Sequence, residues 1–433
     1  MRKYRFRTAY RWLHGTLGLI SGLVVFILGI TGFLYSFEKE IQEYTQPFRF
    51  YDVPLELTKG DELLPSQLME IAQRELPKHE IHSIKYVKWQ PEVNLENQMS
   101  KQRAAEVIFY HSSEDSTYYY KIFLNPRSGE VFQVHNMLDG FFAWVLRGHF
   151  YLWLPSEIGK LIVATATLLF FILIFLGLIL WFPKRWTKIK SWKQRLTTQW
   201  SQKTRWRRKN FDLHGLIGFY SLLGALVLSI TGLYYGFNWW AMLYYKSLGG
   251  KKEVIFEEPL AKKNSRKQSD SISKLYLEFK RNNPKSDNIS NATTTLRALP
   301  TKKEISLEPT ALDRIYGKYK SRLDTGIDVM MEIHPQKDSN KCVEVSFNSS
   351  YYTYGGSEYE FVDPTTLELQ PVQAIYGSRK GRSFADKMML WNYDIHTGGI
   401  LGWWGKLLMA IFSLMIATLP ITGVLMWWGR RNK

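Results

Sequence analysis

Residues 14–32 of the chain read HGTLGLISGLVVFILGITG, and residues 214–232 read HGLIGFYSLLGALVLSITG in the same register. Both copies begin with histidine and glycine, continue through an apolar run and end with threonine and glycine. A well-registered internal repeat predicts two copies of one structural unit. Each copy has a histidine at the edge of a membrane-length segment, which makes that histidine a candidate functional residue.

Four apolar stretches are long enough to cross a bilayer. Each has about 20 residues, or roughly 30 Å of helix, which matches the hydrocarbon core of a membrane. They are Leu17 to Phe37, Leu161 to Phe182, Leu216 to Tyr235 and Leu407 to Trp428. The first does not read as a signal peptide, because its apolar core is too long and its pattern recurs inside the chain. The mean hydropathy of -0.23 predicts that the two long connecting segments fold as water-exposed domains.

The net charge of +18 is concentrated beside these apolar stretches. Between Pro183 and Asn210 there are 11 Lys and Arg residues and no Asp or Glu, and both ends of the chain are also basic. Short basic segments beside membrane helices stay in the cytoplasm, so we expect both termini and this loop to be cytoplasmic. Tryptophans interleave with the basic residues of the loop, which is typical of anchoring at a lipid interface. We therefore expect membrane lipid among the partners and no nucleic acid.

The two connecting segments have the patterns of small α+β modules. Alternating apolar residues predict three strands in each, and a turn closes each set. The first segment contains a predicted helix at 61–72, strands at 84–89, 105–110 and 118–123, and a turn at 125–131; the second contains a helix near 272–279, strands at 329–333, 343–347 and 358–362, and a turn at 363–368, after a Lys-rich insertion at 251–283. The fold class is thus membrane α-helical: a four-transmembrane-helix bundle from a twofold internal repeat, with two small α+β extracytoplasmic modules.

Four histidines fall at two membrane depths. His14 and His214 lie at the cytoplasmic start of helices, and we call them the inner pair; His149 and His396 lie just before the returning helices, and we call them the outer pair. Two neutral imidazoles that face each other across a helix bundle are typical axial ligands of six-coordinate haem iron. A zinc site is an alternative, but each pair lacks the carboxylate or Cys neighbours that would complete a tetrahedron. No Cys-x-x-Cys-His motif exists, so any haem is held without covalent attachment.

Glycines accompany these histidines. On a straight helix His14 and Gly32 would lie on one face about 27 Å apart, as would His214 and Gly232. Gly177 and Gly423 supply small surface from the returning helices at the inner edge. We predict that these four glycines contact a cofactor. Other histidines are predicted to be surface residues, although His135, 14 residues before His149, is an alternative outer ligand if one helix spans both; the surface set is His79, His82, His111, His135 and His334.

The chain resembles the PepSY-associated transmembrane proteins, a family that includes iron-regulated inner-membrane ferric-siderophore reductases. The resemblance covers nearly the whole chain and rests on four kinds of feature: Leu13-His14-Gly15 with Thr31-Gly32, Leu213-His214-Gly215 with Thr231-Gly232, the helix ends 177–181 and 423–427, and the turns 125–130 and 363–368, which are similar to the Asp-Pro-x-Thr-Gly turn of PepSY modules. It implies two haem b groups per chain, held by His14, His214, His149 and His396 as metal ligands. It also implies electron transfer across the bacterial inner membrane to a ferric siderophore or another iron chelate.

The resemblance also sets the expected domains. They are 1–37, the first transmembrane helix with a basic cytoplasmic N-terminus; 38–136, the first periplasmic PepSY-like module; 137–183, a pre-helix segment and the second transmembrane helix; 184–212, a basic cytoplasmic loop; 213–237, the third transmembrane helix; 238–388, the second periplasmic PepSY-like module; and 389–433, a pre-helix segment, the fourth transmembrane helix and a basic C-terminus.

Two functional hypotheses follow. The first is a haem-dependent oxidoreductase that takes electrons from an unidentified cytoplasmic or quinol donor and reduces a periplasmic ferric chelate to release iron. Tyr351, Tyr352 and Tyr354, with Arg379, Lys380 and Arg382, offer a candidate surface for an anionic, aromatic chelate, and the alternative is a solvated loop. The second hypothesis is a non-enzymatic membrane anchor or sensor whose PepSY modules bind a peptide or a protease.

Overall fold

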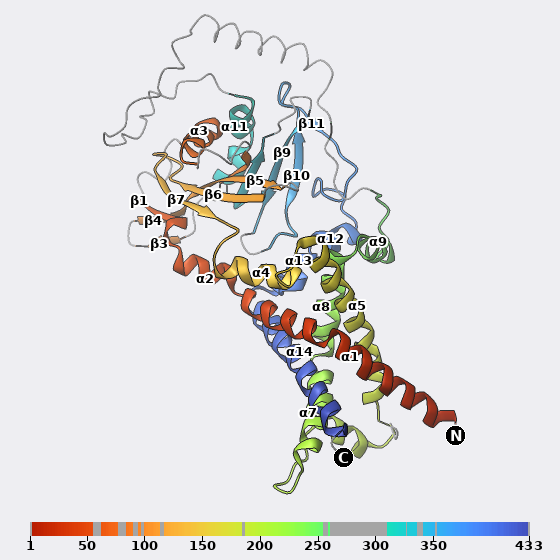
Figure 1. The fold of residues 1–433 in the computed structure, drawn as a ribbon. Coiled ribbons are helices and arrows are strands. Elements are labelled where there is room, and N and C mark those ends of the chain that lie inside the picture. Colours follow the sequence, from red (N-terminus) through yellow and green to blue (C-terminus); the bar gives the residue numbers. More distant parts are fainter. Residues whose placement is uncertain are drawn as a thin grey trace, which may run out of the picture. The chain divides into compact units, whose positions relative to one another are not determined.

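The computed structural model (Figure 1) describes residues 2–54, 62–76, 84–89, 94–96, 99–112, 117–183, 187–253, 259, 310–325, 327–335, 341–350 and 353–431. The chain divides into two compact units. The helical unit comprises residues 1–41, 139–250 and 384–433, and the sheet unit comprises residues 42–138 and 251–383. Each of them combines segments from both halves of the sequence.

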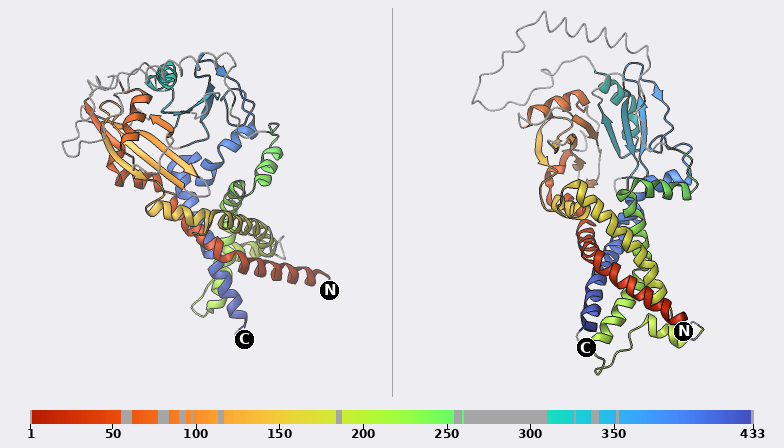
Figure 2. Two further views of the ribbon diagram at one scale, coloured as in Figure 1. Left: turned by 45° about the horizontal axis from the view of Figure 1, so that its top comes forward. Right: turned by 45° about the vertical axis from the view of Figure 1, so that its right-hand side comes forward.

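Three long helices form the frame of the helical unit: α1 (Arg2–Tyr35), α5 (Ser156–Trp181) and α14 (Gly402–Arg431). In both views of Figure 2, α1 lies beside α14 and α5. Within the described residues, three stretches are long and apolar enough to cross a membrane, at Phe6–Tyr35, Ser156–Trp181 and Gly399–Gly429. Three of the four predicted spans are therefore continuous helices.

The fourth predicted span is broken. Helices α7 (Trp206–Tyr220) and α8 (Leu222–Gly236) meet at Ser221 with a bend of 61°, and only together do they reach the length of a span. The prediction of one straight helix over Leu216 to Tyr235 was wrong, and His214 and Gly232 do not share one helix face. Gly224 packs so closely on Phe412 that a Cβ would lie 2.2 Å from its ring. Serine and glycine sites of this kind are where helices commonly bend.

Two short connections reverse the chain direction before the returning helices. Helix α4 (Phe141–Tyr151) ends at Leu152 and Trp153, which both have positive φ, and α5 follows. Helix α13 (Asn392–Thr397) ends at Gly398, which also has a positive φ, and α14 follows. The remaining helices of the unit are α6 (Ile189–Leu196), α9 (Asn238–Ser247) and α12 (Phe384–Leu390), and α2 (Glu38–Thr45) continues from α1 into the sheet unit.

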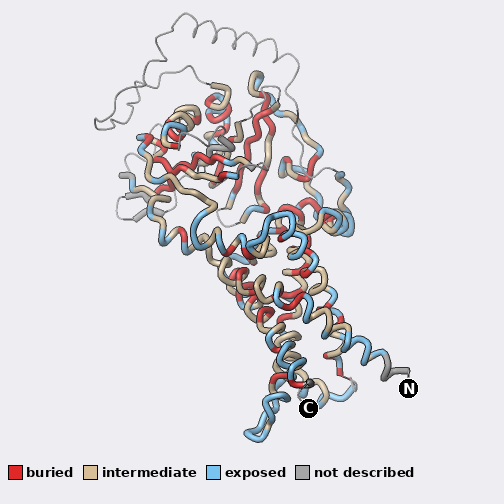
Figure 3. Tube along the Cα trace, viewed as in Figure 1, coloured by how far each residue is buried: buried red, intermediate tan, exposed pale blue. Residues whose placement is uncertain are grey.

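The long helices keep many residues exposed or only partly buried (Figure 3), and many of the exposed residues are large and apolar. Leu19, Ile20 and Leu23 are exposed on α1, and Leu161 and Phe175 are exposed on α5. A water-soluble protein rarely exposes so many large apolar residues on neighbouring helices. This surface is suited to contact with lipid.

The sheet unit is built on an eight-stranded antiparallel sheet with the order β11-β10-β9-β8-β2-β5-β6-β7. Its strands are β2 (Ile84–Trp89), β5 (Ala105–Ser112), β6 (Thr117–Leu124), β7 (Val131–Asn136), β8 (Met330–His334), β9 (Val343–Asn348), β10 (Glu358–Val362) and β11 (Leu369–Gln370). A small second sheet has the order β1-β4-β3, from β1 (Phe50–Pro54), β4 (Met99–Arg103) and β3 (Asn94–Glu96). All six predicted strands are present.

The two predicted modules are joined into one sheet. Their first strands, β2 and β8, pair antiparallel at its centre, with Val87 opposite Ile333 and Lys88 opposite Glu332. The expectation of two separate small modules was therefore wrong for this part of the chain. Pairing in the centre removes one exposed edge from each half, and an exposed edge is a site of unwanted strand pairing.

Helices α3 (Pro65–Arg74) and α11 (Ala311–Asp324) share one hydrophobic core with the sheet. Asp313 connects them, because its carboxylate accepts hydrogen bonds from Ser66 and also caps α11 at Thr310. The predicted helix at 61–72 begins four residues later than expected, and α11 was not predicted. The helix near 272–279 and nearly all of the Lys-rich insertion lie outside the described residues.

The two predicted turns have the same hydrogen bonds. Oδ1 of Asn125 accepts from the two backbone N–H groups at 127 and 128, and Oδ1 of Asp363 accepts from those at 365 and 366. The fifth residue of each turn is left-handed, at φ 76° for Gly129 and φ 59° for Leu367. An Asn and an Asp therefore serve equally at the first position, because the turn uses only an acceptor oxygen.

Gly129→Ala is expected to destabilise the sheet unit by about 1–3 kcal/mol. Its left-handed φ disfavours any Cβ, and that Cβ would lie 2.6 Å from Cδ1 of Ile71 in the core. The melting temperature of the full chain in detergent measures the effect, with the exposed Glu130→Ala as a control that changes stability by no more than about 0.5 kcal/mol. Equal melting temperatures for the two variants would contradict this account of the turn.

Candidate cofactor-binding site

The four histidines meet in the two predicted pairs. His14 on α1 faces His214 on α7 with ring centroids 6.3 Å apart and ring planes at 86°. His149 on α4 faces His396 on α13, also with centroids 6.3 Å apart and planes at 67°. The same separation recurs at two levels of the helical unit. The role of these residues as ligands remains a prediction.

The spacing fits one metal ion between each pair of rings. A metal–imidazole nitrogen bond is about 2.0–2.1 Å, and two such bonds on opposite sides of one ion put the ring centroids roughly 6 Å apart. In the described ranges, no third His, Cys, Asp or Glu joins either pair to form a metal-binding group. A tetrahedral zinc site needs such additional ligands, whereas a planar tetrapyrrole supplies its own four nitrogens. The residues therefore suit the two axial positions of a haem.

Three of the histidines contact a threonine hydroxyl through Nδ1. Thr31 Oγ1 lies 3.0 Å from His149, Thr231 Oγ1 lies 2.8 Å from His396, and Thr422 Oγ1 lies 2.7 Å from His214. Bonding of the far ring nitrogen is the usual way in which a protein orients a metal-binding histidine. In the sequence, Thr31 and Thr231 served only as marks of the repeat, and Thr422 was missed. The Thr-Gly dipeptides that begin at 31, 231 and 422 could have identified these three threonines from the sequence.

Each of the four predicted glycines lies against a histidine ring. A Cβ added at Gly177 would lie 3.2 Å from Cε1 of His14, and the corresponding distances are 3.4 Å from Gly32 to His149, 3.6 Å from Gly232 to His396 and 3.8 Å from Gly423 to His214. The missing side chains let the imidazole rings pack directly on the helix backbones. Direct contact between these glycines and a cofactor remains a prediction.

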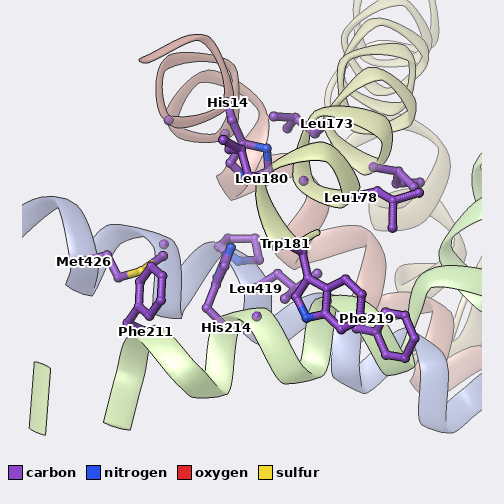
Figure 4. A pocket seen from close by; sticks show the side chains of 18 of the residues that line it. His14, Leu173, Leu178, Leu180, Trp181, Phe211, His214, Phe219, Leu419 and Met426 are labelled. Atoms are coloured by element: carbon purple, nitrogen blue, oxygen red, sulfur yellow. The ribbon is translucent and has the colours of Figure 1, made fainter. Parts of the chain in front are cut away.

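A cavity of about 730 Å³ opens beside the inner pair. His14 and His214 point into it from two helices, and the stacked rings of Trp181 and Phe219, with centroids 4.0 Å apart, lie next to them (Figure 4). Small residues leave the space open; they are Gly15, Gly18, Gly22, Gly177, Gly215, Gly218 and Gly423. A cavity of this size is in the range of sites for small molecules and cofactors.

Polar atoms without partners line this cavity. Nε1 of Trp181 and Oγ of Ser221 are buried without a hydrogen-bond partner in the part of the chain that the structure describes, and the buried Nδ1 of His14 has no side-chain partner there. Buried polar atoms are almost always satisfied, so such a group indicates a missing ligand or water. Arg7, Arg11 and Arg195 also line the cavity. Together these features suit a planar, largely apolar ligand that carries carboxylates.

The other described histidines belong to the sheet unit, not to the helices that carry the two pairs. His135 is on strand β7, not on helix α4 with His149, and its ring is 5.9 Å from that of Phe48. The helix that would have aligned it with His149 is therefore absent. His111 is on β5 and His334 is on β8, while His79 and His82 lie outside the described residues.

Two of the six residues of the predicted chelate surface, both arginines, are engaged within the sheet unit. Arg379 donates to Asp328 at 2.7 Å and to the Gly356 carbonyl, and Arg382 donates to two backbone carbonyls. Of the remaining members, Tyr354 and Lys380 are exposed, whereas Tyr351 and Tyr352 lie outside the described residues. The two arginines thus stabilise the fold, and we do not assign a chelate to this surface.

Comparison with known proteins identifies the family. The family model described as the PepSY-associated TM region matches residues 11–430, nearly the whole chain, so this protein belongs to that family. A search of curated proteins finds no significant match.

Proposed function

We propose that this member of the PepSY-associated TM region family binds two haem b groups and carries electrons across the bacterial inner membrane to reduce a periplasmic ferric chelate. The observation that supports this most directly is the pair of facing imidazole couples, each with a centroid separation of 6.3 Å. When bound, each haem would supply an iron that takes up and releases one electron.

Helix α1 relates the two sites to each other. It carries His14 of the inner pair and, 17 residues later, Thr31, which contacts His149 of the outer pair. On a helix this separation is roughly 26 Å, close to the thickness of a hydrocarbon core. Two sites at these levels suit electron transfer between opposite membrane faces.

The chain's own residues would bind and shield the cofactors. The two imidazoles of each pair would hold one haem iron, and the apolar lining of the inner cavity would exclude water. Arg11 and Arg195 in the cavity lining would pair with carboxylates, whereas Arg7 donates to the backbone carbonyls of Leu180 and Phe182. The basic termini and the basic loop support a cytoplasmic location for that end of the helical unit.

The proposed reaction adds one electron to Fe(III) in a siderophore or another oxygen-rich chelate. The electron comes from a cytoplasmic or quinol donor, and the product Fe(II) is held less tightly by hard oxygen ligands. Reduction would therefore release the iron. The protein need not break a covalent bond in the chelate.

Visible absorption of the purified full chain tests the proposal. We expect a Soret band, reducible α and β bands and, by conversion to the pyridine complex, about two haem b groups per chain. A colourless protein that takes up no added haem would contradict the proposal. That outcome would favour the alternative of a non-enzymatic PepSY anchor or sensor that binds a peptide or a protease.

A further inference from the structure

We propose that Thr31, Thr231 and Thr422 are positioning residues for the ligand imidazoles. His14 lacks such a contact because the equivalent residue is Leu176, and this difference gives the inner site the higher reduction potential. The inference rests on the proposed function, because it concerns the potentials of bound haems. It arises from a structural pattern that occurs at three histidines and fails at the fourth.

The pattern is a Thr-Gly dipeptide packed against the histidine ring, and it is present at three of the four histidines. The glycine approaches Cε1, and the preceding threonine contacts Nδ1, at His149, His396 and His214. At His14 the glycine is Gly177, and a Cβ there would lie 3.2 Å from Cε1 and 3.8 Å from Nδ1. The corresponding distances from Gly32 to His149 are 3.4 and 3.9 Å, so the two rings lie on their glycines in the same way. The residue before Gly177 is Leu176, which has no hydroxyl.

The hydroxyl hydrogens determine the form of the three bonded imidazoles. Each threonine donates to a carbonyl of its own helix, at 2.7 Å for Thr31 to Ile27, 2.6 Å for Thr231 to Val227 and 3.0 Å for Thr422 to Thr418. A hydroxyl has one hydrogen, so its oxygen is left to accept the proton that Nδ1 carries. The opposite nitrogen, Nε2, is then unprotonated and available to a metal.

His14 lacks a threonine hydroxyl that would accept from its Nδ1–H group. Its buried Nδ1 faces the backbone of Leu173 and contacts no hydroxyl in the described residues, because the side chain that takes the threonine's place is a buried leucine. The outer pair therefore has two imidazoles bonded to a threonine hydroxyl, whereas the inner pair has one.

The asymmetry has a consequence for the reduction potentials. An acceptor on Nδ1–H makes the imidazole a stronger electron donor at Nε2, which stabilises Fe(III) and lowers the potential. Two such bonds lower the outer potential more than one bond lowers the inner potential. The arginines at the inner cavity add to this order, because nearby positive charge favours the reduced form. A low potential at the outer pair suits ferric chelates, because oxygen ligands stabilise Fe(III).

Leu176→Thr, with Leu176→Val as its control, tests the inference. Threonine and valine have nearly the same shape, so the two variants differ by one hydroxyl. Redox titration of the full chain, followed by visible absorption, should resolve two midpoint potentials. We expect Leu176→Thr to lower the higher potential relative to Leu176→Val and to leave the lower one unchanged. If both variants bind two haems but have equal midpoint potentials, the inference is overturned and the proposed function is left intact.

Thr231→Val provides the reverse test at the outer pair. We expect it to raise the lower potential, narrow the gap between the two potentials and weaken haem retention by about 10- to 100-fold. Variants that lack the outer histidines assign each midpoint potential to its site, because only the potential of the inner haem remains in them. A two-haem Thr231→Val protein with wild-type potentials would contradict the positioning role, and a wild-type chain that binds no haem would overturn both this inference and the proposed function.

Discussion

On the proposed function, His149→Ala is expected to lower the haem content from two groups per chain to about one. The substitution removes one of the two imidazoles whose centroids lie 6.3 Å apart, and the Thr31 hydroxyl keeps only its bonds to its own helix. A haem held by one remaining imidazole in a helical bundle loses much of its binding free energy. His14→Ala should have the same effect at the inner pair, and the double variant should lose both groups, because the sites lie far enough apart to act independently.

Haem content of the purified chain, measured as the pyridine complex, provides the test. His135→Ala is the matched control, because His135 lies on strand β7 and should not affect the content. Added imidazole should restore binding to a His149→Gly variant if the loss reflects a missing ligand and not unfolding. If His149→Ala and His14→Ala both retain two haems, the pairing of the histidines as ligands is wrong.

The repeat in the sequence predicted the pairing of the histidines, but not how the rings are held. Residues at equivalent positions of two copies share a depth, so His14 was matched with His214 and His149 with His396. The contacts from Thr31 and Thr231 depend on helices α4 and α13 turning back onto α1 and α8. Such contacts arise from tertiary packing, and no local pattern of residues reports them.

Local periodicity also predicted elements better than their connections. The alternation in Ile84 to Trp89 identified strand β2 with its observed bounds. Its pairing with β8, more than 240 residues later, depends on which edges meet in the folded unit. The bend at Ser221 was missed for a related reason, because the apolar run continues through it and the packing of Gly224 on Phe412 comes from a distant helix.

Gly405→Ala is expected to cost about 3 kcal/mol and to remove the outer haem. A Cβ at this position would lie 2.1 Å from the Gly398 carbonyl oxygen and 2.7 Å from Cβ of Leu401. The carbonyl belongs to the backbone and cannot rotate away as a flexible side chain does. Gly398 is the residue after α13, two positions beyond His396, so its displacement would move the ring from Thr231 and from His149.

Gly159→Ala should act in the same way on the other half of the outer pair. Its Cβ would lie 2.2 Å from the carbonyl oxygen of Tyr151, which is two positions beyond His149. Melting temperature and haem content of each variant measure the effect, while the inner haem should remain bound. Gly317→Ala is the control, because its Cβ meets no atom within 4 Å in helix α11, where alanine should stabilise the helix by up to about 1 kcal/mol. Two retained haems and a wild-type melting temperature in Gly405→Ala would show that the close contact between Gly398 and Gly405 does not hold the outer histidine in place.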